Sequence, residues 1–419
     1  MRAAQWMAGL RALIVAVLAG AGAGLIAVLT YQAMLALQAL VWNTGTEHGE
    51  VGPVRIALTI LAGGAMLILL GRLARSESVD ELIADAGAAQ PGHARRILVT
   101  ALAAIVAIAF GGAVGPEAGL LAVVAQCSIL VTRVIARNEA RAREISRAGV
   151  AGALSGFYGS PPAAAAIDDG ELSAGKLTSF IAGLSGFFVF FAMSRTVFDG
   201  SGLSDIPLPT STEGNDWLLV IPALIGCGFG LAFKALHHAG EAAAARIGSP
   251  WLVTAIGTAL FAALAAAIPL VRFSGHHELN ELPELFADGD AALLWLVAAA
   301  KIVAVVLCLS SGWRGGEAFP LIYVGGLVGA ATALALPGLD PASAIVAAMG
   351  ATLSVGWKRP LVALLILILI LDTGFALPLL IGVGLGAVVH KASTAAPAET
   401  SAPAEASAPR TATTEGSNG

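Results

Sequence analysis

Charge is scarce in this chain, and its basic residues form no cluster of the kind that binds nucleic acid. Only 12% of the 419 residues are charged, whereas 57% are hydrophobic and 50 are glycine. This balance excludes a soluble globular protein and predicts a polytopic membrane protein. The many glycines favour close packing and interruption of helices within a bilayer.

Cysteine and histidine are also rare, which limits redox and metal chemistry. The three cysteines lie inside apolar segments, where packing explains them better than a disulfide framework: Cys127, Cys227 and Cys308. The histidine pairs at 237–238 and 276–277 flank such segments without the spacing of metal ligands. We expect no metal site and no cofactor.

The apolar segments are long enough to cross a membrane several times. The first runs from Met7 to Val41 after Arg2 and lacks a cleavage site, which predicts a retained membrane helix with a cytoplasmic N-terminus. Further spans are expected at residues 54–70, 176–198, 217–235, 251–271, 291–310 and 375–389. We expect a multi-pass protein of the cell inner (plasma) membrane.

The connecting segments are polar. The arginine-rich residues 133–147 predict a solvated interfacial loop, and the acidic segments 199–216 and 273–290 predict extracytoplasmic loops. Residues 76–96 predict a short helix that dips into the membrane and returns to the same side. Residues 392–419, rich in Ala, Pro, Ser, Thr and Glu, predict a disordered tail in the cytoplasm or otherwise exposed to solvent.

Residues 110–119, Phe-Gly-Gly-Ala-Val-Gly-Pro-Glu-Ala-Gly, place a single carboxylate, Glu117, between apolar segments. An ionisable residue at membrane depth is costly and usually faces the protein interior or a water-filled path. The glycines interrupt a helix, and Pro116 suits the first position of a new one. Such a helix start offers unpaired N–H groups and the positive dipole end to an anion.

A second glycine-rich break, Ser-Ser-Gly-Trp-Arg-Gly-Gly-Glu-Ala-Phe-Pro, covers residues 310–320 and also opens an apolar run. In addition, the Gly-Ala pair at 152–153 leads to Pro162 as the pair at 350–351 leads to Pro360. Interrupted helices at matching places predict an inverted-repeat transporter with its substrate site at the breaks. We expect the repeats over about residues 50–200 and 215–391, within one transmembrane domain of residues 1–391.

The chemistry of the breaks suits a small anion. A desolvated halide needs donors without a full opposite charge, because a full charge would hold it too tightly to leave. Backbone N–H groups at helix starts meet this need. Glu117 can act there as a tethered anion: charged, it fills the site, and protonated, it swings out and admits the substrate.

The two breaks carry a resemblance. Gly115-Pro116-Glu117 with its preceding glycines resembles the Gly-Arg/Lys-Glu-Gly-Pro element of the CLC chloride channel and chloride/proton antiporter family. Residues 310–320 are similar to the Gly-x-Phe-x-Pro element of that family. The similarity covers roughly residues 10–390 and is greatest to a short bacterial branch that carries Gly-Pro-Glu. It implies an all-α fold with broken and re-entrant helices, and a homodimer in the lipid bilayer with one pathway per subunit.

The resemblance also implies roles for individual residues. It makes Glu117 the external gate and assigns the anion site to Ser76, Gly115, Pro116, Ala118, Gly316, Glu317, Ala318, Phe319 and Pro320. Phe319 is displaced by one position from the phenylalanine of the family. The internal proton acceptor of the exchangers aligns with Glu171, beside Asp168 and Asp169. The late anion-coordinating tyrosine of the family has no counterpart, so the inner gate is incomplete.

We therefore expect transmembrane transport of chloride or a similar small anion, as a proton-coupled antiporter or a gated channel. The retained Glu117 favours exchange, whereas the missing tyrosine favours channel-like flow. One alternative is a passive fluoride or chloride channel. Another is an intramembrane enzyme in which Glu117, Asp168 and Asp169 act on a lipid, and a third is a structural subunit without flux.

Overall fold

The fold is all-helical in the part of the chain that the structure describes. A computed structural model describes residues 2–43, 51–74, 94–135, 139–166, 174–198, 206–212, 214–371 and 373–395. Within these residues the only extended pairing is one isolated antiparallel bridge, between Gly115 and Gly316. The all-α fold class expected from the sequence is confirmed.

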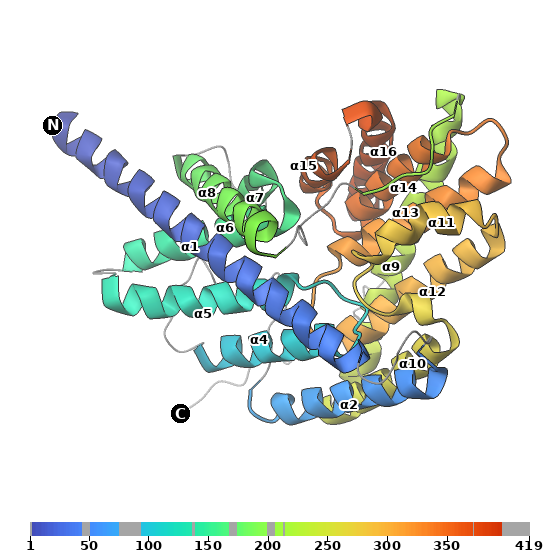
Figure 1. Cartoon of the computed structure of the whole chain (residues 1–419), viewed down its shortest axis with the longest axis horizontal. Helices are drawn as coiled ribbons and strands as arrows, with labels where there is room; N and C mark the ends of the chain where they lie inside the picture. Colours follow the sequence, from blue (N-terminus) through green and yellow to red (C-terminus); the bar gives the residue numbers. More distant parts are fainter. Residues whose placement is uncertain are drawn as a thin grey trace, which may run out of the picture.

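The first half of the chain forms seven described helices. In Figure 1 α2 lies at the lower edge of the molecule, and the others lie toward the left. They are α1 (Arg2–Asn43), α2 (Pro53–Gly71), α4 (Ala94–Ala109), α5 (Glu117–Ile135), α6 (Glu139–Tyr158), α7 (Pro161–Ala166) and α8 (Ala174–Val197).

The second half forms the longer helices α9 (Val220–Ile247), α10 (Pro250–Ala267), α12 (Ala291–Ser310), α13 (Ala318–Ala335), α14 (Pro341–Gly356), α15 (Pro360–Ile370) and α16 (Ala376–Ala395). Short elements connect them: the 3-10 turns η2 (Asp216–Leu219), η3 (Pro269–Val271), η4 (Glu278–Glu281) and η5 (Thr373–Phe375), and α11 (Leu282–Ala287). Proline stands at the first position of α2, α10, α14 and α15, where its missing N–H has no helical partner to lose.

Eight of the described helical segments are long and apolar enough to span a membrane. Three more apolar helices are shorter, and two of them, Glu117–Ser128 and Pro360–Ile370, follow breaks in the chain. The 42 residues of α1 rise about 63 Å at 1.5 Å per residue, roughly twice the thickness of a bilayer core. In Figure 1 this helix crosses the molecule diagonally. The chain is a multi-pass membrane protein.

The helices of the two halves pack in the same order. In the first half α4 contacts α5, α5 contacts α6, and α6 contacts both α7 and α8. In the second half α12 contacts α13, α13 contacts α14, and α14 contacts both α15 and α16. The most extensive helix pairings between the halves are α2 with α10 and α7 with α15 (Figure 1). The interrupted helices of the two halves thus face each other in the middle of the molecule.

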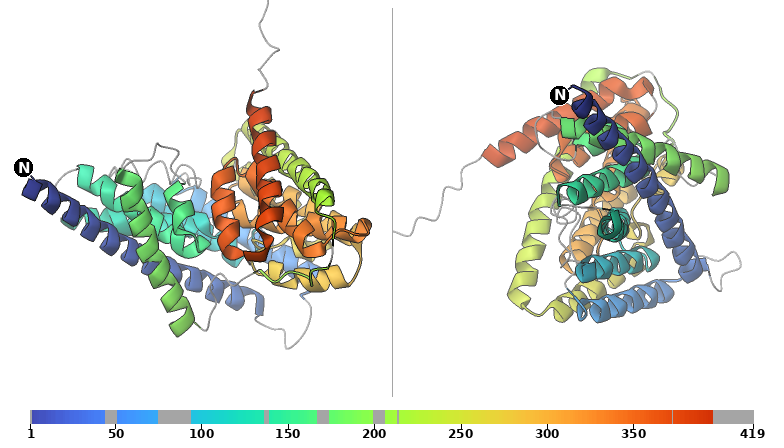
Figure 2. Two further views of the ribbon diagram at one scale, coloured as in Figure 1. Left: turned by 90° about the horizontal axis from the view of Figure 1, so that it is seen from above. Right: turned by 90° about the vertical axis from the view of Figure 1, so that its left-hand side faces the viewer.

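Glycine permits the closest of these helix contacts. Where α1 and α8 cross, as Figure 2 shows, a Cβ atom on Gly24 would overlap the backbone of Gly186. A Cβ on Gly152 of α6 would approach the backbone of Gly20 to 2.6 Å. Small residues drive helix association in lipid because they let backbones approach. The high glycine content is therefore used in packing as well as in the breaks.

Three sequence-based boundaries differ from the structure. The loop expected at residues 133–147 was wrong, because α5 continues to Ile135 and α6 begins at Glu139. The last span and the tail were also misplaced by a few residues, since α16 extends to Ala395. The short helix predicted near residues 76–96 lies mostly outside the described residues, as does the tail beyond 395.

Candidate functional site

The two glycine-rich breaks meet at the centre of the molecule. The N–H of Gly115 donates to the carbonyl of Gly316 at 2.8 Å, and the N–H of Gly316 donates back to the carbonyl of Gly115 at 2.9 Å. Directly after this bridge the chain enters α5 at Glu117 and α13 at Ala318. Two helix N-termini therefore start side by side, and both offer unpaired N–H groups and positive dipole ends.

Glu117 lies in the cradle that this bridge forms, with 0% of its surface exposed. The cradle has no room for further side chains, since a Cβ atom on Gly115 or on Gly316 would overlap the Glu117 carboxylate. The hydroxyl of Tyr158 donates a 3.2 Å hydrogen bond to Oε1 of the carboxylate. Among the described residues, no donor pairs with Oε2.

Tyr158 is the residue that sequence reasoning missed. It ends α6, and its ring stacks on Phe319 of α13 with centroids 5.9 Å apart and planes at 20°. Trp357, at the end of α14, contacts the other side of the site with its ring 5.8 Å from that of Tyr158. One signal was available, because a tyrosine at a Gly-Ser-Pro break places a hydroxyl where a helix is interrupted.

The break after Tyr158 contacts α15, the helix that follows the matching break of the second half. Gly159 has a φ of 64°, which a residue with a side chain rarely adopts, and α7 starts two residues later. The Ser160 hydroxyl accepts from the N–H of Ala163 and donates to the carbonyl of Leu365 in α15 at 2.7 Å. Four interrupted segments, two from each half, therefore converge around Glu117.

A loop after α10 covers the bridge, and Lys301 of α12 holds it in place. The fully buried Lys301 ammonium donates to three successive carbonyls: Val271 at 3.1 Å, Arg272 at 2.9 Å and Phe273 at 2.7 Å. The N–H of Phe273 donates to the carbonyl of Gly111 in the first break. Phe273 has a φ of 57°, an uncommon backbone conformation for a bulky residue that surrounding contacts must maintain.

The structure places most predicted site residues together and leaves others outside its described part. Gly115, Pro116, Ala118, Gly316, Ala318, Phe319 and Pro320 are buried at the two breaks, and Glu317 is half-buried there. Phe319, despite its displaced position, packs its ring against Tyr158 and Phe157. The residues Ser76, Asp168, Asp169 and Glu171 lie outside the described residues.

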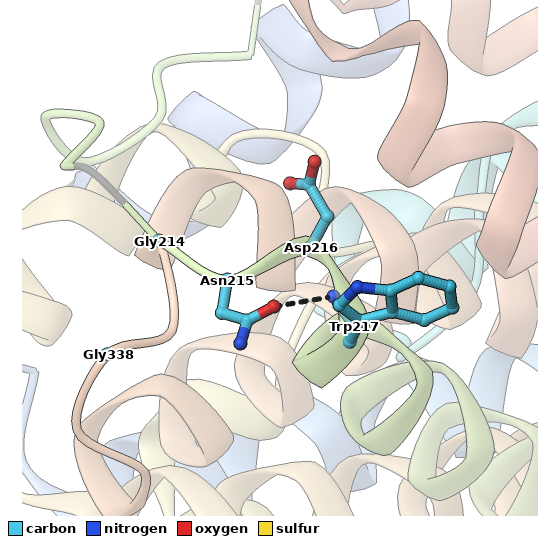
Figure 3. A pocket seen from close by; sticks show the side chains of 5 residues that line it. All are labelled: Gly214, Asn215, Asp216, Trp217 and Gly338. Atoms are coloured by element: carbon cyan, nitrogen blue, oxygen red, sulfur yellow. Dashed lines mark hydrogen bonds between the residues drawn. The ribbon is translucent and has the colours of Figure 1, made fainter.

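A second hollow lies elsewhere, at the start of α9, and Figure 3 shows the side chains that line it. Its lining residues are Gly214, Asn215, Asp216, Trp217 and Gly338. The side chain of Asn215 accepts from the N–H of Trp217 at 3.1 Å and so caps the turn before the helix. Trp217 is 85% exposed at one end of a span, which is the usual place of an interfacial membrane anchor. This hollow contains no interrupted helix, and we assign it no role in the site.

The fold and the buried carboxylate together define a class: a multi-pass membrane protein in which broken helices from two halves meet around a buried ionisable residue, as in inverted-repeat transporters. A family model described as voltage gated chloride channel matches residues 74–391. The chain belongs to that family. A search of curated proteins finds no match in sequence.

Solved structures share the fold. A slow cyanobacterial Cl⁻/H⁺ antiporter superposes with a TM-score of 0.72 at 18% identity, covering 92% of this chain and 96% of its own. A CLC-type fluoride/proton antiporter gives 0.62 at 16% identity, covering 91% and 97%. A eukaryotic CLC transporter gives 0.70 at 18% identity, covering 91% of this chain and 72% of its own.

Proposed function

We propose that this protein moves chloride or a similar small anion across the membrane in exchange for protons, with Glu117 as the gate. The observation that carries the proposal is the position of the Glu117 carboxylate. It is buried between two helix N-termini that are bridged through Gly115 and Gly316. A charged carboxylate there occupies the place that a mobile anion would take, because both respond to the same N–H groups.

Protonation gives the gate its function. A neutral carboxylic acid has less attraction to the helix N-termini than a carboxylate, so it can leave the cradle and admit an anion. Return of the charged form expels the anion and closes the path. One proton is thereby linked to each opening, which is the basis of exchange. Glu171, Asp168 and Asp169 remain our predicted inner proton acceptors.

The donors of the anion site follow from the same geometry. We infer that the N–H groups at the starts of α5 and α13, near Ala118, Ala318 and Phe319, hold the anion. The predicted Ser76 hydroxyl completes this set in the proposal. The Tyr158 hydroxyl is the one additional side-chain donor that the structure places at Glu117. We propose that it takes over part of the role of the missing late tyrosine.

The wider setting is also a proposal. The matching helix order supports two repeats within one transmembrane domain. We infer a homodimer in the plasma membrane, because the family resemblance implies one pathway in each of two subunits. The halide stays open between chloride and fluoride, since antiporters of both kinds share the fold. Retention of the buried gate favours exchange over a passive channel.

The test is efflux of chloride, nitrate and fluoride from liposomes that hold the purified protein, with external pH recorded. We expect anion efflux coupled to proton uptake in the wild type. Glu117→Gln keeps the side chain neutral and should abolish the proton movement. Glu284→Gln, an exposed carboxylate on α11, is the matched control and should behave as wild type.

Each other result has a defined meaning. Anion efflux without proton movement in the wild type would make the protein a channel. The absence of efflux of all three anions from a folded dimer would contradict transport, and assays for lipid turnover would then decide between an enzyme and a structural subunit.

A further inference from the structure

A cluster of two histidines and a tyrosine packs against Phe319 at the second break. The loop held by Lys301 carries His276 and His277, and α1 carries Tyr31. The Tyr31 hydroxyl lies 3.1 Å from Nδ1 of His276 and 3.5 Å from Nε2 of His277. A phenol has one hydrogen, so at most one ring nitrogen accepts from it while the other must be an N–H that donates. The three groups form a continuous hydrogen-bonded unit.

A small cavity connects this unit to the first break. Its volume is about 20 Å³, and its lining includes Tyr31, Gln38, Gly112, Pro116, Ser274 and His277. A cavity needs roughly 10–15 Å³ and polar partners to hold one water molecule. The hydroxyl, amide and imidazole groups supply those partners. Pro116, which directly precedes Glu117 in the chain, forms part of the cavity wall, so the cavity ends at the start of α5.

The cluster also packs against the aromatic residues of the site. The ring of His276 contacts Phe319 edge-on with centroids 4.7 Å apart, and Phe319 stacks on Tyr158. His277 is exposed, whereas Tyr31 is only 4% exposed and Glu117 is fully enclosed. The cluster therefore reaches from solvent to the outer boundary of the gate.

The loop faces the side of the membrane where α1 ends. Trp42, near the end of α1, contacts Phe273 with ring centroids 5.4 Å apart and lies under the Arg272 guanidinium. The predicted cytoplasmic N-terminus makes this the extracytoplasmic side. The hydrogen bonds of Lys301 fix the loop and maintain the uncommon backbone conformation of Phe273. The histidines therefore keep their position over the first break.

Building on the proposed exchange function, we propose that His277, Tyr31 and His276 form the outer proton-entry site for Glu117. His277 takes a proton from the external solution onto its imidazole ring. It then passes a proton through the cavity water to the Glu117 carboxylate and returns to its neutral form. Tyr31 and His276 are positioning residues, because their hydrogen bonds orient the His277 ring toward the cavity.

Imidazole suits this task because its charge changes near physiological pH. Burial and the neighbouring His277 lower the pKa of His276 to about 3, so His276 stays neutral and acts as a hydrogen-bond partner. Further titratable groups lie near the cluster. Glu278 on the loop and Glu117 on α5 act electrostatically on Tyr31. Glu278 in turn interacts with Arg272 on the loop, Lys301 on α12 and Tyr323 on α13.

The test follows the proton directly and does not need transport. After a rapid drop in pH, the carboxylic acid band in the infrared spectrum of the purified protein reports protonation of Glu117, and Glu117→Gln identifies the band by its loss. In His277→Ala we expect the band to appear about 100-fold more slowly, with the same final amplitude. Tyr31→Phe should also slow the appearance of the band. His238→Gln, an exposed histidine on α9, is the control and should match wild type.

Chemical rescue separates proton transfer from a structural role. His277 is exposed, so free imidazole in solution can reach its place in His277→Ala and should restore the rate. A wild-type rate in His277→Ala would overturn the proposal, as would a slow rate that imidazole fails to restore. A wild-type protein without a Glu117 band would overturn it too. Because the band is read without anion flux, a failure of the transport assay leaves this result independent.

Discussion

Gly115 and Gly316 pair backbone to backbone through two hydrogen bonds, although 201 positions separate them in the sequence. The Cα atoms of both residues face the Glu117 carboxylate, and neither position has room for a methyl group. The bridge thus fixes the starts of α5 and α13 relative to each other and sets the size of the cradle between them. A rigid cradle of donors is the kind of preorganised site that binds an anion without reorganisation.

The size of this cradle can be tested with one methyl group. Gly316→Ala should displace the carboxylate from its place, so that anion flux depends less on the proton gradient. Overpacking of this kind also costs roughly 1–3 kcal/mol of stability. Gly228→Ala is a matched control, since a Cβ there meets nothing within 4 Å. The measurement is the ratio of proton to anion flux in liposomes. An unchanged ratio in folded Gly316→Ala would show that the carboxylate does not rest in the cradle during transport.

The Tyr158 hydroxyl is the second point to test. Tyr158→Phe keeps the ring on Phe319 and removes the donor to Oε1 of Glu117. A hydrogen bond to a charged group contributes about 1.5–3 kcal/mol, so we expect the closed gate to weaken and uncoupled anion flux to rise about 10-fold or more. Flux through Glu117→Gln should change much less on adding Tyr158→Phe, because the charged partner is already absent. Equal effects in both backgrounds would assign Tyr158 to packing alone.

Lys301 should be required for the outer loop. Lys301→Met fills similar space but removes the donor to the carbonyls of Val271, Arg272 and Phe273. We expect a loss of roughly 2–4 kcal/mol of stability. The rate of hydrogen exchange in residues 268–280 should increase in this variant. Lys234→Met, which loses only an exposed bond to Ser393, is the control. Unchanged exchange in the loop would contradict the anchoring role.

The low pKa of His276 predicts a pH dependence of stability. An unfolded chain binds a proton on this imidazole below about pH 6.5, whereas the folded protein accepts it only below a pKa of about 3. The unfolded state therefore binds more protons within this window, so stability should fall as the pH decreases from 6.5 toward 3. Thermal unfolding at a series of pH values checks this. His276→Gln should flatten the curve over the same range, and His238→Gln should not.

The sequence allowed prediction of the breaks and of the buried carboxylate between them because their signals are local. Glycine runs, a proline at a helix start and a lone carboxylate between apolar segments can each be interpreted from the residues immediately around them. Most membrane spans were located by the length and hydrophobicity of their segments, which are also local signals. The arginine-rich stretch at residues 133–147 was misjudged because charge indicates solvent exposure without excluding a helix.

The contacts around the gate could not be predicted, because they join residues that are far apart in the chain. Tyr158 and Glu117 are 41 positions apart, and Tyr31 and His276 are 245 positions apart. The pattern of hydrophobic residues does not predict which face of α6 contacts α5, or that the loop after α10 packs against α1. In the sequence His276 and His277 flank a segment like any polar pair, and only the packing of the loop gives them a place near the gate.

The scarcity of tyrosine makes this protein its own spectroscopic probe. The chain has three tyrosines, and all three are buried: Tyr158 beside Glu117, Tyr31 at the histidine pair, and Tyr323 beneath the outer loop with its ring near the Lys301 ammonium. A phenol signal in ultraviolet Raman or infrared spectra thus comes entirely from Tyr158 beside Glu117, Tyr31 at the histidine pair and Tyr323 beneath the outer loop. Gating can be followed in the unlabelled protein, and a single Tyr→Phe variant is enough to assign each band.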